Sequence, residues 1–156
     1  MRSRGLIAGA VALVAIAAGA GYFLWSRSEA IPRIDPGDTV QVARGQAVYA
    51  AQCARCHGVN LEGQPSWRVQ LPNGRLPAPP HDASGHTWHH PDSDLFGITK
   101  YGLGPYAPAG YQSDMPTFGG TLSDEQIAAV LSYIKSTWPP DVRARQARIN
   151  AQAEQQ

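Results

Sequence analysis

The sequence predicts an all-α fold in which few helices and long loops form one domain, preceded by a single N-terminal transmembrane helix. Residues 5–26 contain no charged side chain, which is typical of a membrane span. Apolar residues recur with a helical period in only two later stretches, near residues 39–53 and 123–136. Between Gly58 and Gly120 no period persists, while Gly, Pro, Asn and Ser recur every few residues. This pattern indicates a loop-rich helical domain behind an apolar segment.

The N-terminal segment is long enough to cross a bilayer. A helix rises ~1.5 Å per residue, so residues 5–26 would span the ~30 Å hydrocarbon core. Arg2 and Arg4 precede the segment, and positive charge favours retention of this end in the cytoplasm. We therefore expect residues 1–27 to be an inner-membrane anchor that places the rest of the chain in the periplasm.

A cleaved signal peptide is the alternative for the same segment. Ala18-Gly19-Ala20 has the small-x-small form that a signal peptidase accepts. The apolar stretch is longer than the ~7–15 residues of a signal h-region, and its bulkiest residues follow the possible cleavage site, so an uncleaved anchor is favoured. Both interpretations export the chain, and cleavage would leave a soluble periplasmic protein.

Composition divides the remaining chain into three parts. Residues 28–37 contain Pro32 and Pro36 and predict a semi-stiff linker. The folded domain is expected over residues 38–140. Residues 141–156 have almost no large apolar side chain and predict either a solvated helix or a disordered tail. The net charge of +1, with no run of Lys or Arg, excludes a nucleic-acid-binding function.

The first helix of the domain is predicted to begin after Asp38, which is an N-cap candidate, and to end near Cys53. Its apolar side chains have the spacing of one helix face, at Val40, Ala43, Ala47, Val48 and Ala51. The loop-rich stretch that follows is expected to contain one or two short helices, one of them around residues 92–101.

The last helix of the domain has the clearest signal. Ser123 and Gln126 form a capping box, and acidic residues occupy the first turn. An apolar stripe follows at Ile127, Val130, Leu131 and Ile134. Pro139-Pro140 is expected to end the helix.

Cys53-Ala54-Arg55-Cys56-His57 is the most specific motif in the chain. Two thiols three positions apart, followed directly by a histidine, have the spacing for covalent attachment of c-type haem, in which each sulfur adds to one vinyl group and the imidazole reaches the iron. A zinc site would need further ligands, but the chain has only two cysteines. A thioredoxin-like redox pair would follow a strand of a βαβ unit, which the flanking sequence does not indicate.

With this motif in place, residues 40–138 resemble the class I cytochrome c family, specifically the small bacterial monohaem type. In that family an N-terminal helix with a small residue and an aromatic four later crosses the C-terminal helix, and Gly45, Tyr49 and Tyr133 match these positions. The resemblance implies a cytochrome c fold, with few helices and long loops wrapped around one covalently bound haem c held by Cys53 and Cys56.

The resemblance also implies the two axial iron ligands. His57 is the proximal ligand, and its Nδ1 proton is expected to bond the carbonyl of Pro79 or Pro80. Met115, in the sequence Met115-Pro116-Thr117-Phe118, matches the Met-Pro-x-Phe loop of the family and is the expected distal ligand. Trp67 and Trp88 are expected either to bond the haem propionates or to pack.

The segment from His81 to Asp92 departs from the plain family pattern because it holds every histidine other than His57. His86, His89 and His90 are candidates for a second metal site that would bind copper or zinc. The alternatives are that these histidines are exposed loop polars, that they bond propionates and backbone, or that one of them replaces Met115 on the iron.

A six-coordinate His/Met haem has no open site for substrate, so the function predicted is one-electron transfer rather than catalysis. The expected partners are membrane-bound redox proteins that act as electron donors and acceptors in a periplasmic respiratory or related chain. Two alternatives remain. One is a haem-bearing relay subunit of a membrane oxidase or dehydrogenase, and the other is a periplasmic metal-handling or sensor protein that uses the His81–His90 loop.

Overall fold

A computed structural model describes residues 31–155 of the chain. The predicted membrane segment, residues 1–27, lies outside the described residues. Within residues 31–155 the secondary structure is helical, with no strand. None of the helices of this described part is both long and apolar enough to cross a membrane.

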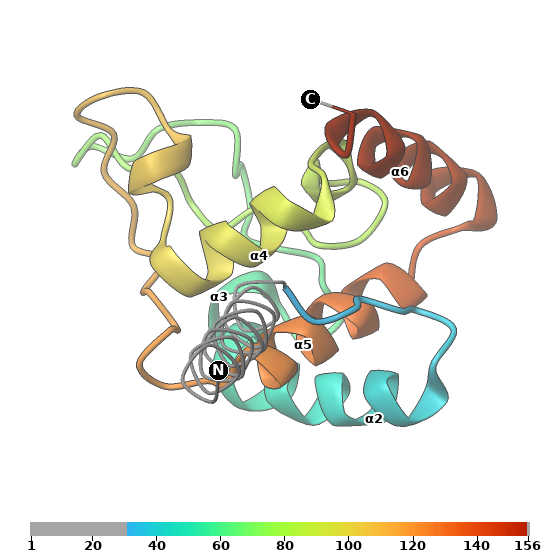
Figure 1. Cartoon of the computed structure of the whole chain (residues 1–156). Helices are drawn as coiled ribbons and strands as arrows, with labels where there is room; N and C mark the ends of the chain where they lie inside the picture. The colour runs from blue at the N-terminus through green and yellow to red at the C-terminus, as the bar shows by residue number, and fades with distance from the viewer. Residues whose placement is uncertain (1–30, 156) are drawn as a thin grey trace, which may run out of the picture. The chain divides into compact units, whose positions relative to one another are not determined.

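Helices α2 (Thr39–Val48) and α5 (Asp124–Ser136) lie against each other (Figure 1). Gly45 of α2 lies at this crossing, against Ala129 and Tyr133 of α5. A Cβ atom built on Gly45 would lie 1.9 Å from the carbonyl oxygen of Ala129 and 2.9 Å from the Cβ of Tyr133. No side chain fits in that space, so glycine is what permits the close approach. The rings of Tyr49 and Tyr133 pack at 5.4 Å beside the crossing. The helix pair predicted from Gly45, Tyr49 and Tyr133 is therefore confirmed.

The helical run that starts at α2 does not stop at Cys53. It continues through a π-helical turn, Tyr49–Cys53, into the short helix α3 (Ala54–His57), which ends at Gly58 with φ +80°. The Tyr49 hydroxyl donates to the carbonyl of Gly58 at 2.8 Å and so satisfies one acceptor at the end of the run. Cys53, Cys56 and His57 of the predicted haem motif consequently lie on consecutive turns of one helical run.

The other predicted helices are present with the expected ends. Helix α4 (Asp92–Tyr101) matches the predicted range, and α5 begins with the predicted capping box. The Ser123 amide donates to Gln126 Oε1 at 2.9 Å, and the Gln126 amide donates to Ser123 Oγ at 3.3 Å. Short 3₁₀ turns at Thr87–His89 and Gly104–Tyr106 interrupt the loops.

Helix α5 is the centre of the packing because it contributes to two buried apolar clusters. The first cluster contains Tyr49, Leu61, Val130, Ile134, Trp138 and Val142. The second contains Leu95, Phe96, Phe118, Leu122, Ile127 and Leu131. The apolar side chains predicted on α5 therefore divide between the two clusters.

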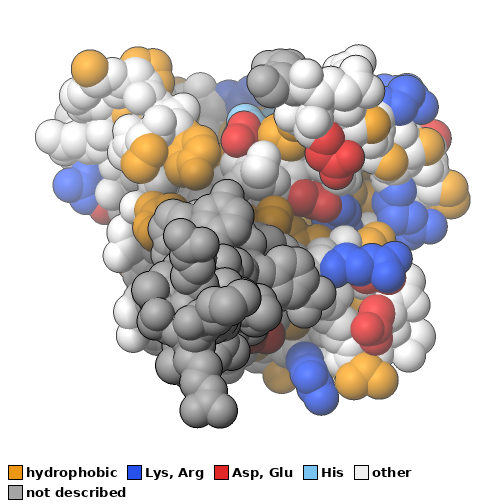
Figure 2. Space-filling view, in the orientation of Figure 1, with side chains coloured by type: hydrophobic (Ala, Val, Ile, Leu, Met, Phe, Trp, Pro, Cys, Tyr) orange, Lys and Arg blue, Asp and Glu red, His pale blue; other side chains and the backbone are white. Residues whose placement is uncertain are grey.

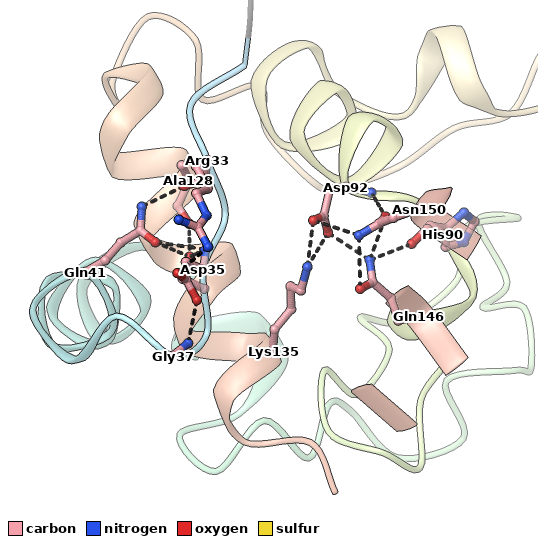
Figure 3. A network of polar contacts seen from close by, with 11 residues as sticks. Arg33, Asp35, Gly37, Gln41, His90, Asp92, Ala128, Lys135, Gln146 and Asn150 are labelled. Carbon is pink, nitrogen blue, oxygen red and sulfur yellow. Dashed lines mark hydrogen bonds and ion pairs between the residues drawn. The ribbon is translucent and has the colours of Figure 1, made fainter. Parts of the chain in front are cut away.

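The folded unit begins before the predicted boundary at Asp38. The Asp35 amide donates to Ser132 Oγ at 2.9 Å and to Gln41 Oε1 at 3.0 Å, and Gln41 Nε2 donates to the carbonyl of Arg33 at 2.9 Å (Figure 3). These bonds hold residues 33–37 on α2 and α5. The end of the predicted linker thus belongs to the domain, because polar side chains from both helices bind its backbone.

The predicted tail forms helix α6 (Pro140–Ala153), which packs on the domain. Gln146 is only 1% exposed, and Gln146 Nε2 donates to Asp92 Oδ1 at 2.8 Å. Asn150 Nδ2 donates to Asp92 Oδ2 at 2.9 Å, while Lys135 Nζ donates to both oxygens of Asp92 at 2.6 Å (Figure 3). The composition of this segment is compatible with either a solvated helix or a disordered tail. The helix is instead held by a buried polar network, which compensates for the scarcity of large apolar side chains.

The Asp92 network makes a stability prediction. Lys135 is 6% exposed, so Asp92→Ala leaves a buried ammonium group without its counter-ion and should lower the free energy of unfolding by about 3–5 kcal/mol. Asp141→Ala, which breaks the exposed pair with Arg145, should cost less than about 1 kcal/mol. Guanidinium denaturation of the haem-loaded protein measures both. Equal losses in the two variants would contradict the structural role of the network.

Candidate functional site

A cavity of about 760 Å³ lies between α3, α4, α5 and the loops that connect them. Its volume is within the range of cofactor pockets. Most of the wall is apolar, and helices α4 and α5 contribute Leu95, Ile98, Val130, Leu131 and Ile134. Both predicted thiols, the predicted proximal histidine and the predicted distal methionine line this one cavity. The structure therefore brings together residues that are as many as 62 positions apart in the sequence.

Cys53 and Cys56 lie on the wall that the helical run forms, and neither is in a disulfide. Burial, together with the charge of the neighbouring Cys56 thiolate, raises the pKa of the Cys53 thiol to about 11. Redox-active Cys-x-x-Cys pairs depend on a lowered thiol pKa, so this environment does not favour the thioredoxin-like alternative. Two thiols at the edge of an apolar cavity fit the covalent attachment of haem.

His57 is oriented by a hydrogen bond from its ring to the backbone. Its Nδ1 atom lies 2.8 Å from the carbonyl oxygen of Pro79, and the side chain is 8% exposed. Because a carbonyl can only accept, Nδ1 must carry the proton, and the lone pair of Nε2 is then available to a metal. Burial lowers the pKa of His57, which favours the neutral ring that a metal requires. Of the two predicted acceptors, Pro79 is the one used.

The loop that carries Pro79 is itself held close to α3. The Gly63 amide donates to the carbonyl of His57 at 2.7 Å, and the Gln64 amide donates to the carbonyl of Ala78 at 2.9 Å. A Cβ on Gly63 would lie 2.4 Å from the backbone nitrogen of Pro80, and this residue has φ +70°. Only glycine fits there, so the acceptor for His57 is fixed by backbone contacts.

His81 has a place that the sequence analysis did not assign. Its ring stacks on that of His57, with centroids 3.9 Å apart and an interplanar angle of 24°. Its Nδ1 atom lies 2.9 Å from Thr87 Oγ1, and its carbonyl accepts from the indole N–H of Trp138 at 2.8 Å. Burial lowers the pKa of His81 well below its ordinary value, so the stacked ring is neutral. The sequence signal for this contact is that His81 lies two residues after Pro79, whose carbonyl binds His57.

Met115 is partly buried against the second apolar cluster and lines the cavity. Its amide donates to Ser113 Oγ at 3.0 Å. The end of its loop is bound to α4, because the amide of Phe118 donates to the carbonyl of Thr99 at 3.1 Å and the amide of Gly119 donates to that of Lys100 at 2.9 Å. The distal residue predicted from the sequence is thus placed at the same cavity as His57.

The three histidines predicted for a second metal are not gathered into one site. His86 and His90 line the cavity with ring centroids 5.6 Å apart, whereas His89 packs on Trp88 at 3.7 Å. Across residues 31–155, no group of three or more His, Cys, Asp or Glu side chains is arranged to hold a metal ion. The geometry therefore gives the second metal site no support.

The two tryptophans differ in their surroundings. The Trp88 indole N–H donates to the carbonyl of Ala83 at 3.3 Å, so Trp88 packs rather than pointing its donor at the cavity. Trp67 lines the cavity and stacks on His86 at 5.3 Å.

The mouth of the cavity is bordered by exposed apolar side chains from the loops, at Leu71, Tyr106 and Tyr111. Figure 2 shows hydrophobic side chains gathered over the loop that follows α4.

Comparison with known proteins adds one finding. The family model described as Cytochrome c matches residues 42–138, which run from α2 to just beyond α5 and include every predicted haem residue. Helix α6 lies outside the matched range. The chain has no significant match among curated proteins or solved structures.

Removal of the thiols tests the covalent attachment. Cys53→Ser and Cys56→Ser should each leave one thioether, because either sulfur alone can bond the haem. The double variant should lose all covalent haem, because the sequence has no third cysteine. Haem staining after denaturing electrophoresis is the measurement. Covalent haem that persists in the double variant would show that another residue is the attachment point.

Proposed function

Because the chain belongs to the cytochrome c family, we propose that it is a one-electron carrier in which His57 and Met115 would hold the haem iron. Family membership establishes covalently bound haem c and haem-based electron transfer. The observation that supports the finer proposal is the meeting of both thiols, His57 and Met115 at one cavity. The haem supplies one-electron exchange between two oxidation states of iron.

The residues of the cavity have separate tasks in this function. Cys53 and Cys56 would hold the group covalently, and the Pro79 carbonyl keeps the His57 ring in the tautomer that leaves Nε2 available. Met115 would provide the second ligand, and its thioether would raise the reduction potential. The apolar walls from α4 and α5 exclude water, so the surroundings of the iron change little between oxidation states. A site closed on both faces exchanges electrons rather than binding substrate.

A substitution at the distal position tests the closed site. Met115→Ala should abolish the weak far-red absorption band that arises from sulfur-to-iron charge transfer in the oxidised protein. Its reduced form should also bind carbon monoxide, because the distal position is then open. Ser113→Ala removes only the hydrogen bond to the Met115 amide and should keep the band. A wild-type protein without this band, or one that binds carbon monoxide as readily as Met115→Ala, would contradict His/Met ligation.

We further propose that residues 1–27 anchor the protein in the inner membrane with the haem domain in the periplasm. The uncharged stretch 5–26 and the preceding Arg2 and Arg4 support this placement. An anchor would confine the carrier to the membrane surface and raise its effective concentration near membrane-bound donors and acceptors. Redox proteins of that membrane are the proposed partners.

Extraction from membranes tests this placement. The full-length protein should require detergent for release, its intact mass should include residues 1–27, and it should elute as a monodisperse single chain. A mass that begins after Ala20 would show a cleaved signal peptide and a soluble carrier. Stable co-elution with other redox subunits would favour a relay subunit of a membrane complex over a free carrier.

A further inference from the structure

Two loops meet at the mouth of the cavity. One runs over residues 64–78 and the other over residues 103–117, and both line the cavity. Five ion pairs are formed within residues 31–155, and only that between Arg75 and Asp114 joins these loops. It is also the only hydrogen bond or ion pair in the described part of the chain that ties residues 107–117 to another segment.

Arg75 is presented by a structured turn. The Leu71 amide donates to the carbonyl of Arg75 at 2.9 Å, and the Gly74 amide donates to the carbonyl of Leu71 at 2.8 Å. The Arg75 amide in turn donates to Asn73 Oδ1 at 3.0 Å. Gly74 has φ +80°, the left-handed conformation that closes such a turn. These bonds fix the backbone of Arg75 and so limit where its guanidinium group can lie relative to Asp114.

Asp114 directly precedes Met115 in the chain. The position of Asp114 therefore limits where the Met115 side chain, and with it the thioether sulfur, can lie. The chain after Met115 is bound to α4 through the amides of Phe118 and Gly119. Before Met115, the hydrogen bonds of residues 107–115 other than the one to Arg75 stay within that segment, as in the bond from the Met115 amide to Ser113. The loop is thus anchored on one side by backbone bonds and on the other by Arg75.

We propose that Arg75 is a positioning residue that holds Met115 on the iron through its ion pair with Asp114. This inference rests on the proposed ligation by Met115. A small external ligand such as imidazole can bind the iron only after the Met115 loop moves away. The ion pair opposes that movement, so its loss makes displacement of the thioether easier without changing the ligand itself.

The side chains of the pair are 36% and 61% exposed, so the expected effect is modest. Arg75→Met should bind imidazole about two- to fivefold more tightly than the wild type and still show the far-red band when imidazole is absent. Arg75 does not line the cavity, so this substitution leaves the walls intact. Raising the salt concentration to about 1 M should bring the wild-type affinity toward that of Arg75→Met.

Two further variants separate a specific pair from general effects. The charge swap Arg75→Asp with Asp114→Arg should restore the wild-type affinity for imidazole. Asp141→Asn, which removes an acidic charge from an exposed pair on α6, should leave the affinity unchanged. All variants are measured as full-length holoprotein in detergent, by imidazole titration of the oxidised haem.

The outcomes distinguish the positioning role from the ligation on which it rests. A wild-type protein that lacks the far-red band shows that Met115 is not the ligand, and both proposals are then wrong. If the band is present but Arg75→Met binds imidazole no better than the wild type, only the positioning role is wrong. A charge-swapped protein that still binds imidazole as tightly as Arg75→Met would likewise overturn the positioning role.

Discussion

The hydrogen bond between His57 and the carbonyl of Pro79 is the interaction on which the site depends. It fixes the tautomer of the ring, so that the lone pair of Nε2 is left available to a metal. The carbonyl is held in turn by the close passage of Gly63 and by the bond between Gln64 and Ala78. One short helix and one proline-bearing loop are thereby joined at His57, the proposed iron ligand.

The long loops can pack stably because the cavity is part of the core. Helix α5 supplies both apolar clusters, yet the segments between residues 58 and 91 and between 102 and 122 contain little regular structure. Such loops could bury few apolar side chains against one another. They instead turn them toward the cavity, where a covalently bound haem completes the packing. Covalent attachment at Cys53 and Cys56 makes that part of the core permanent.

Local signals were sufficient for the parts of the fold that depend on sequence neighbours. The spacing of Cys53, Cys56 and His57 and the capping box at Ser123 are both set within one or two helical turns. The structure confirms the capping box and places the two thiols and His57 at one cavity. Helix α6 and residues 33–37 depend instead on polar contacts with other elements, such as those of Gln146 with Asp92 and of Asp35 with Ser132. His81 stacks on the ring of His57, which belongs to another segment. The bond from Gln146 to Asp92 leaves no periodic trace, so composition alone left the tail's structure open.

Iron K-edge X-ray absorption on the oxidised full-length holoprotein tests the central claim most directly, because it reports the atoms bonded to the iron. The account predicts a sulfur scatterer from Met115 beside the nitrogen shell of the porphyrin and His57. A shell of nitrogen alone would contradict it and would point to a second histidine as ligand. A coordination number reduced by one would indicate an open iron, which a simple electron carrier does not need.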